Sequence, residues 1–205
     1  QGKAIGETIL GLGLRKLGVL SVNDAFGVGL AVKFRETIEK GGGRIVAAET
    51  AHPGQGDVRT QLEKLRTANP EGVFLVLHPG QAVAALKQIR ELAIRARLFG
   101  ADTFSNRDVY GVAKAEAQGV IFSLPAQPDS PTFKQFSTEY ENAYKAPADI
   151  NAAAAYDATM LLARAVRAGA RTGEQIRQYF DKQEPYEGAS GLIIWDENGD
   201  VISKK

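Results

Sequence analysis

The chain has 205 residues, 44% of them hydrophobic, and its 25 Lys and Arg residues nearly balance 24 Asp and Glu residues, giving a formal net charge of +1. This length and composition predict a globular protein with a core of substantial size. Charges of both signs are scattered along the sequence, a pattern that does not favour nucleic acid or an anionic membrane as a partner. The absence of cysteine excludes disulfides, thiolate metal sites and cysteine nucleophiles.

The N-terminal residues have the pattern of a helix, with Ile5, Ile9 and Leu12 on one side. They lack the charged-then-apolar layout of a signal peptide, and an opening inside a helix predicts that upstream sequence is missing. No apolar run approaches the roughly 18 to 20 residues that a membrane-spanning helix needs, so direct membrane insertion is not expected.

The stretch 17–31 combines a strand, a tight corner and the start of a helix. An apolar run from Leu17 to Val22 has strand length, Asn23-Asp24 forms a polar corner, and a helical period of apolar residues follows. Ligands of open α/β sheets bind outside the carboxyl ends of the strands, so Phe26 at this corner is a candidate ligand contact. The alternative role for Phe26 is a hydrophobic staple that pins its helix.

Strand and helix patterns then alternate as far as residue 124. The sequence predicts strands at 44–50, 72–77, 97–101 and 119–124, and helices at 57–68, 81–94 and 105–115. Repeated strand-helix units predict an α/β fold with a doubly wound parallel sheet, in which right-handed crossovers place helices on both faces.

The character of the sequence changes after residue 124. Pro125, Pro128 and Pro131 predict a stiff connector and a domain crossing, followed by helices at 132–144, 150–168 and 172–182. The chain closes with a predicted β-hairpin over 191–203, turning at Asn198-Gly199.

The glycine pattern Gly27-Val-Gly-Leu-Ala-Val32 begins like a dinucleotide-binding fingerprint, but Val32 stands where the third glycine belongs. The favoured interpretation is that Gly27 and Gly29 let the helix start close to its neighbours. There is no P-loop and no Gly-x-Ser-x-Gly motif, and the two histidines, His52 and His78, lie in separate loops. We therefore expect no catalytic residue, no metal site and no cofactor.

Two further corners follow predicted strands. Asp102 comes directly after the strand at 97–101, where an unpaired carboxylate could accept hydrogen bonds from a ligand ammonium group. Its alternative role is a cap for the next helix, although Thr103 and Ser105 are better placed for that. His78 to Gln81 end the third strand and open a helix whose backbone N–H groups suit a carboxylate, or form a plain surface turn.

Tyr156-Asp157 lies inside an alanine-rich helical segment, and the favoured interpretation is a helix-packing pair rather than a catalytic acid.

An ordered set of short motifs resembles one protein family over nearly the whole chain. The set comprises Asn23-Asp-Ala-Phe-Gly-Val-Gly-Leu-Ala31, the glycines before the second strand, Gly54-Gln-Gly-Asp57 with Gln61-Leu-x-Lys-Leu65, Ala154-Ala-Tyr-Asp-Ala158, and Gly188-x-Ser-Gly191 to Asp200. It is similar to the extracytoplasmic solute-binding proteins of ABC importers, of the leucine/isoleucine/valine-binding type. Those proteins have the type I periplasmic-binding fold.

The resemblance implies a ligand held between two α/β lobes that close by a hinge motion. It implies that Asp102 takes the ammonium group of an amino-acid ligand and that Phe26, where a tyrosine is frequent, walls the ligand without a hydroxyl contact. His78 and Gln81 match the loop that supplies side-chain pocket contacts. The implied function is non-catalytic binding of a small solute, an amino acid first of all, in the periplasm or another extracytoplasmic space, for delivery to the membrane permease of an ABC importer.

The resemblance also implies that most of the first lobe is absent. Residues 1–124 with 188–205 would form the second ligand-binding lobe, and the helical segment 125–187 would pack with the missing first lobe. Two other functions remain open at this point: a ligand-sensing domain of a signalling receptor or regulator with the same fold, and, with less support, a nucleotide-dependent enzyme.

Overall fold

The computed structural model describes residues 1–124, 129–197, 199 and 201–203. The chain divides into two compact units, residues 1–124 and 125–205. The predicted connector residues Pro125 and Pro128, and Asn198 of the predicted turn, lie outside the described residues.

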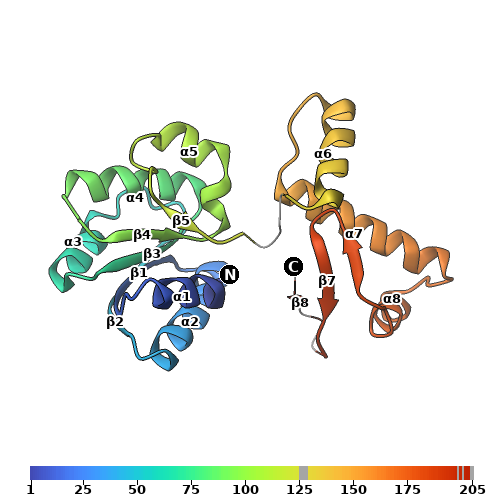
Figure 1. The fold of residues 1–205 in the computed structure, drawn as a ribbon, viewed down its shortest axis with the longest axis horizontal. Helices are drawn as coiled ribbons and strands as arrows, with labels where there is room; N and C mark the ends of the chain where they lie inside the picture. The colour runs from blue at the N-terminus through green and yellow to red at the C-terminus, as the bar shows by residue number, and fades with distance from the viewer. Residues whose placement is uncertain (125–128, 198, 200, 204–205) are drawn as a thin grey trace. The chain divides into compact units, whose positions relative to one another are not determined.

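The first unit is built on a five-stranded parallel sheet with the order β2-β1-β3-β4-β5 (Figure 1). Its strands are β1 (Lys16–Val22), β2 (Arg44–Ala51), β3 (Gly72–Val76), β4 (Arg97–Gly100) and β5 (Ile121–Phe122). Its helices are α1 (Gly2–Gly11), α2 (Ala25–Lys40), α3 (Arg59–Ala68), α4 (Pro79–Glu91), the 3₁₀ helix η1 (Asp102–Ser105) and α5 (Arg107–Ala113). The predicted doubly wound parallel sheet is confirmed.

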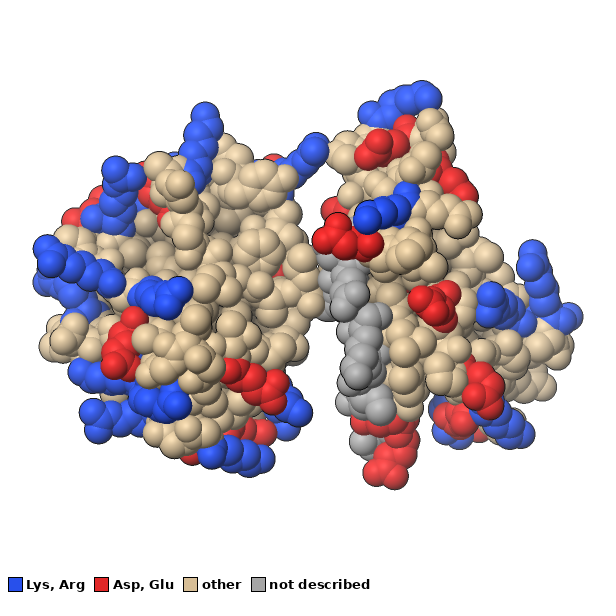
Figure 2. All heavy atoms as spheres, viewed as in Figure 1, with Lys and Arg blue, Asp and Glu red and all other residues tan. Residues whose placement is uncertain are grey.

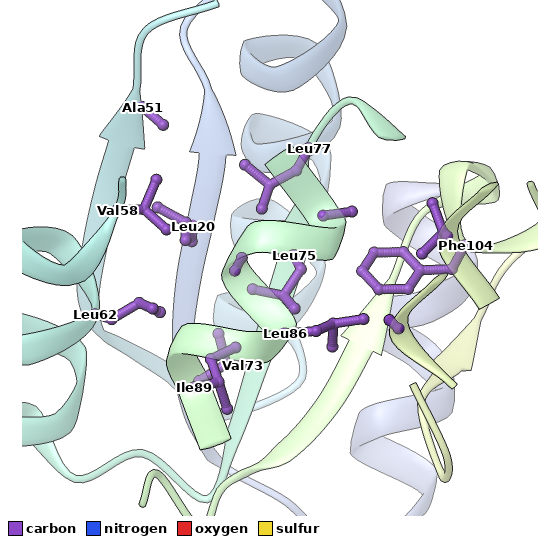
Figure 3. Close-up of a cluster of buried hydrophobic side chains, with 14 of the residues drawn as sticks. Leu20, Ala51, Val58, Leu62, Val73, Leu75, Leu77, Leu86, Ile89 and Phe104 are labelled. Atoms are coloured by element: carbon purple, nitrogen blue, oxygen red, sulfur yellow. The ribbon is translucent and has the colours of Figure 1, made fainter. Parts of the chain in front are cut away.

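Strand β3 lies at the centre of the sheet and is buried on both sides. Val73 and Leu75 face one hydrophobic cluster, whereas Phe74 and Val76 face the other, as the alternation of side chains along a strand requires. Helices α3, α4 and α5 cover the first face (Figure 3), and α1 and α2 cover the second. A central parallel strand covered on both faces explains why its sequence is continuously apolar.

Two predicted elements are shorter in the structure than the sequence pattern indicates. The strand predicted at 119–124 is reduced to Ile121–Phe122: residue 119 ends a run of turns, and residues 120, 123 and 124 are not part of a strand. The helix predicted at 105–115 begins at Arg107 and ends at Ala113. In the N-terminal helix, Ile5 and Ile9 are buried as predicted, but Leu12 follows the end of α1 and is 42% exposed.

The second unit combines three helices with a small antiparallel sheet. The helices are α6 (Pro131–Tyr144), α7 (Ile150–Arg167) and α8 (Gly173–Phe180), and the sheet has the order β6 (Tyr186–Gly188), β7 (Gly191–Trp195) and β8 (Val201–Ser203). The three predicted helices and the terminal strand pair are confirmed, but the sequence did not reveal β6. The hairpin belongs to this compact unit, and the predicted grouping of 188–205 with 1–124 as one lobe stays a prediction.

Each helix of the second unit starts at a residue whose side chain caps it. Ser130, Asp149 and Thr172 accept hydrogen bonds from the first turns of α6, α7 and α8, and Thr172 forms a reciprocal capping box with Gln175. None of the helices in the described part of the chain is long and apolar enough to cross a membrane. On the face shown in Figure 2, basic and acidic side chains are interspersed over both units.

Candidate functional site at the carboxyl edge of the sheet

The carboxyl ends of four strands meet at one edge of the sheet in the first unit. The register pairs Val22 with Ala51 and Ser21 with Val76, so β1 ends level with both of its neighbours. The chain leaves β1 toward β2 on one side, whereas β3 lies on the other side of β1. This reversal between β1 and β3 is the topological switch point at which ligands of such sheets bind.

Asp24 forms the corner after β1. Its Oδ1 accepts a hydrogen bond of 2.9 Å from the backbone N–H of Gly27 and so caps α2. Gly27 is required here because a Cβ would overlap the carbonyl oxygen of Val22, whereas a Cβ at Gly29 would meet nothing within 4 Å. The expected close start of the helix therefore depends on Gly27 alone, and the prediction for Gly29 is wrong.

The second oxygen of Asp24 reaches across the switch point to His78, at the end of β3. Oδ2 of Asp24 lies 2.7 Å from Nε2 of His78, although 54 residues separate them in sequence. The hydrogen bond from the Gly27 N–H, and next the one from His78, lower the pKa of the Asp24 carboxyl below its usual value. The carboxylate is consequently ionised at neutral pH.

Phe26 completes this group of side chains. Its ring stacks on the imidazole of His78 with a centroid separation of 5.8 Å and an interplanar angle of 20°. The Phe26 side chain also packs against the apolar cluster beneath α1 and α2. Both roles considered for Phe26, pinning the helix and presenting a ring at the corner, are compatible with this position.

Asp102 lies after β4, the next strand along the same edge. Its carboxylate is partly buried and has no hydrogen-bond or ion-pair partner among the residues that the structure describes. The expected alternative caps are wrong: Asn106 caps α5 by accepting from the N–H of Asp108, and the hydroxyl of Ser105 donates to the Asp102 carbonyl. The carboxylate of Asp102 is therefore available to a ligand.

Gln81 is 4% exposed and holds the loop that follows β2. Its amide nitrogen donates to the carbonyl of His52 over 2.8 Å and to that of Gln55 over 3.3 Å. Further along the same helix, Gln88 accepts a hydrogen bond from the N–H of Val58 and donates one to the carbonyl of Gly56. These two glutamines of α4 fix a loop that has little regular structure of its own.

Asp157 of the second unit is fully buried and serves the fold. Its two oxygens accept hydrogen bonds of 2.8 and 2.7 Å from the backbone N–H groups of Ala189 and Ser190, in the turn between β6 and β7. The expectation that Tyr156-Asp157 is a packing pair rather than a catalytic acid fits this position. Throughout the described ranges, no three His, Asp or Glu residues are grouped so that they could hold a metal ion.

Sequence reasoning placed Phe26, His78, Gln81 and Asp102 at strand ends, and the structure puts all four at the same edge of one sheet. It did not single out the Asp24 side chain, which joins two of these ends. The strand order would have provided the signal, because an acidic residue after β1 and a histidine after β3 become neighbours only if β3 pairs with β1.

Comparisons with known proteins identify relatives of this chain. The chain is 24% identical over 92% of its length to the Leu/Ile/Val-binding protein homolog 3 of Brucella melitensis, of which it covers 52%. It is 23% identical over 91% of its length to the leucine-, isoleucine-, valine-, threonine-, and alanine-binding protein of Pseudomonas aeruginosa, of which it covers 50%. The chain thus spans about half the length of the curated relatives it matches.

Solved structures extend the likeness to the fold. A leucine-binding protein from Thermotoga maritima matches 98% of this chain with 59% of its own length, a TM-score of 0.86 and 26% identity. A branched-chain amino acid transporter substrate-binding protein from Streptococcus pneumoniae, solved with isoleucine, matches 98% of this chain with 58% of its own, a TM-score of 0.83 and 26% identity. A model of the periplasmic binding protein family matches residues 1–204. The chain belongs to the periplasmic binding protein family.

Proposed function

We propose that this chain carries one ligand-binding face of an extracytoplasmic solute-binding protein, that its solute is an amino acid, and that binding leaves the solute chemically unchanged. The names of the relatives support the ligand class, since they refer to leucine, isoleucine and valine among other amino acids. The structural neighbour with isoleucine supports the same class. In this proposal the closed, liganded protein is recognised by the membrane permease of an ABC importer.

The observation that carries the proposal is the unpartnered carboxylate of Asp102 at the ligand-binding edge of the sheet. A partly buried carboxylate without a partner loses hydration, and a ligand cation restores the lost interactions. The α-ammonium group that all α-amino acids share has the charge and the three donors that this position requires.

Phe26, His78 and Gln81 are assigned supporting roles. The ring of Phe26 offers an apolar wall and no hydroxyl, and His78 lies beside it. Gln81 contributes through the loop at 52–58, because its amide is buried against that loop rather than exposed at the edge. The ligand shifts an equilibrium between open and closed forms in proportion to its higher affinity for the closed form.

The proposal includes packing of the helical segment 125–187 against a first lobe that lies outside these 205 residues. Leu162 and Val166 of α7 support this part, because their apolar side chains are 47% and 46% exposed in the present chain. Hydrogen exchange of α7 in the 205-residue chain and in the full-length gene product tests it. Unchanged exchange in the longer protein would argue against such packing.

A thermal-shift screen of the full-length gene product tests the ligand class. α-Amino acids at about 100 times their dissociation constant should stabilise the protein by about 2.7 kcal/mol, and the same compounds without the amino group should not. Substitution Asp102→Asn should weaken binding by about ten- to a hundredfold, the range expected for a hydrogen bond between two charged groups.

Asp108→Asn is the matched control, because this carboxylate is exposed and lies six residues further along. Equal affinity of wild type and Asp102→Asn would remove the ammonium site from the proposal. Stabilisation by amine-free carboxylates alone would remove amino acids as the ligand class.

A further inference from the structure

The hydrogen bond between Asp24 and His78 determines which nitrogen of the imidazole carries the proton. An ionised carboxylate can only accept, and the other oxygen of Asp24 already accepts from the N–H of Gly27. The hydrogen of the 2.7 Å contact must therefore belong to Nε2 of His78. A neutral imidazole has one N–H, so Nδ1 is left with a lone pair and no hydrogen.

Nδ1 of His78 is available to a ligand. The His78 side chain is 47% exposed, and its only hydrogen-bond partner among the described residues is Asp24 through Nε2. Rotation of the ring is restricted on one side by Asp24 and on its face by Phe26, which stacks at 5.8 Å. The acceptor atom thus has a defined direction before any ligand arrives.

We propose that Asp24 fixes His78 in the Nε2–H tautomer, so that Nδ1 accepts a hydrogen bond from the solute and His78 becomes a specificity-determining residue. This inference rests on the proposed function and narrows its substrate class. The solute is an amino acid whose side chain carries a hydrogen-bond donor, such as an ammonium, guanidinium, hydroxyl or indole N–H group.

The chemistry of the edge supports this class. Among the described residues, the unsatisfied side-chain groups at this edge include the carboxylate of Asp102, Nδ1 of His78 and the buried Oε1 of Gln81, and all three are acceptors. The α-ammonium group satisfies the first, and a donor in the side chain satisfies the second. A purely aliphatic side chain would bury Nδ1 without a partner, which lowers affinity because the lost hydrogen bond to water is not replaced.

Nitrogen-15 NMR of the 205-residue chain tests the tautomer directly. The chain has two histidines, so the imidazole spectrum is simple, and His52→Gln assigns it. At a pH where the nitrogen shifts themselves show neutral rings, His78 should have a protonated Nε2 and an unprotonated Nδ1. An Nδ1–H tautomer, or an even mixture of the two, overturns the proposal.

Asp24→Asn reverses the tautomer in this scheme. The amide oxygen of asparagine can still accept from the N–H of Gly27, while its NH₂ group donates to Nε2 of His78. We expect an unchanged circular dichroism spectrum and a switch of His78 to Nδ1–H. A His78 tautomer that is the same in wild type and Asp24→Asn contradicts control by Asp24.

The ligand arm uses L-ornithine and L-norleucine, which have the same number of heavy atoms and differ by a terminal ammonium in place of a methyl group. The full-length gene product should bind ornithine more tightly, by about tenfold for one hydrogen bond. His78→Phe, which keeps an aromatic ring beside Phe26, should abolish this preference. His52→Phe is the control and should retain it.

The two arms separate this inference from the proposed function. Equal affinity for ornithine and norleucine, with amino acids still bound, overturns the role of His78 and leaves the proposed function standing. Failure to bind any amino acid overturns the proposed function and the substrate class drawn from it, whereas the NMR result still decides the tautomer.

Discussion

In two turns of this molecule an aspartate side chain accepts hydrogen bonds from the backbone, but the two aspartates have different roles. In the first unit, Asp24 accepts from the backbone N–H of Gly27, and in the second, Asp157 accepts from the backbone N–H groups of Ala189 and Ser190, which follow Gly188. Both glycines are obligatory in steric terms: a Cβ at Gly27 would overlap the Val22 carbonyl, and one at Gly188 would overlap the Asp157 carboxylate. In each case a carboxylate fixes a turn whose backbone passes very close to a neighbour.

The difference lies in the second oxygen. Asp157 is fully buried, and both of its oxygens are used by the backbone of one turn. Asp24 is partly exposed and uses its second oxygen to orient His78, the side chain of another strand end. A carboxylate with both oxygens bound to the backbone stabilises the fold. A carboxylate with only one oxygen bound to the backbone can use the other oxygen to orient a second side chain toward solvent.

The largest effect is expected from Asp157→Ala, which leaves two buried N–H groups without a partner. We expect a loss of about 3 to 5 kcal/mol in the free energy of unfolding of the second unit. Trp195, the single tryptophan, lies in β7 and reports the denaturation of this unit by fluorescence. Asp149→Ala, which removes an exposed cap of the same helix, should cost about 1 kcal/mol; equal costs would contradict the structural role of Asp157.

The next effect separates Gly27 from Gly29. Gly27→Ala should lower the melting temperature and cost about 1 to 3 kcal/mol, because the added methyl group has no room beside Val22. Gly29→Ala should be neutral or stabilise by up to about 1 kcal/mol, since its site is open and alanine favours the helix. Thermal melts followed by circular dichroism should show a lower melting temperature for Gly27→Ala and an unchanged or higher one for Gly29→Ala. A lower melting temperature for both variants would contradict the distinction.

Glu71 lies at the opposite edge of the sheet of the first unit, and its carboxylate makes the stability of the fold depend on pH. Oε2 of Glu71 accepts from the backbone N–H groups of Arg15 and Lys16, and these bonds lower the pKa of the Glu71 carboxyl. A carboxyl whose pKa is lower in the folded state than in the unfolded state stabilises the fold. This stabilisation is complete above the ordinary glutamate pKa of about 4.3, and it is lost as the pH falls through the pKa of the folded state.

Glu71→Gln should therefore be less stable than wild type at pH 7, and the difference should shrink below about pH 4. Denaturation at a series of pH values measures it. Glu63→Gln, which removes an exposed partner of Arg66, serves as the control with a small effect throughout. A difference between Glu71→Gln and wild type that grows on acidification would contradict the assignment.

The smallest effect on stability is expected at Asp102. Its carboxylate has no partner in the described part of the chain, so Asp102→Asn should change the free energy of unfolding by less than about 0.5 kcal/mol. The same denaturation experiment, without ligand, provides the measurement. A larger loss would show that the fold uses this carboxylate, and the proposed ammonium site would lose its basis.

The sheet of the first unit was predictable because its strands are apolar runs separated by helices of clear period. β1 to β4 and helices α2 to α4 follow those signals closely, with Val58, Leu62 and Leu65 buried on one face as expected. Strand β6 was not predictable, because three residues without alternation acquire their extended form by pairing with β7. The last strand of the sheet is short because only Ile121 and Phe122 pair with β4, and a run of turns occupies residues 114–119 before it.

The site was predictable only as separate corners. Phe26, His78 and Asp102 each follow an apolar run, which places them at strand ends without stating which ends are neighbours. The contact of Asp24 with His78 depends on β3 pairing with β1, a non-local choice that the hydrophobic pattern does not encode. The burial of Gln81 depends likewise on the path of a loop that begins 29 residues before it.

Gln81 and Gln88 make the loop at 52–58 a dependent part of helix α4. The hydrogen-bond partners of its backbone are side chains about thirty residues later in the chain. During synthesis, the partners that complete the crossover from β2 to α3 are therefore added to the chain after the crossover itself. In the native state, hydrogen exchange at Val58 should follow the opening of α4 rather than that of its own helix.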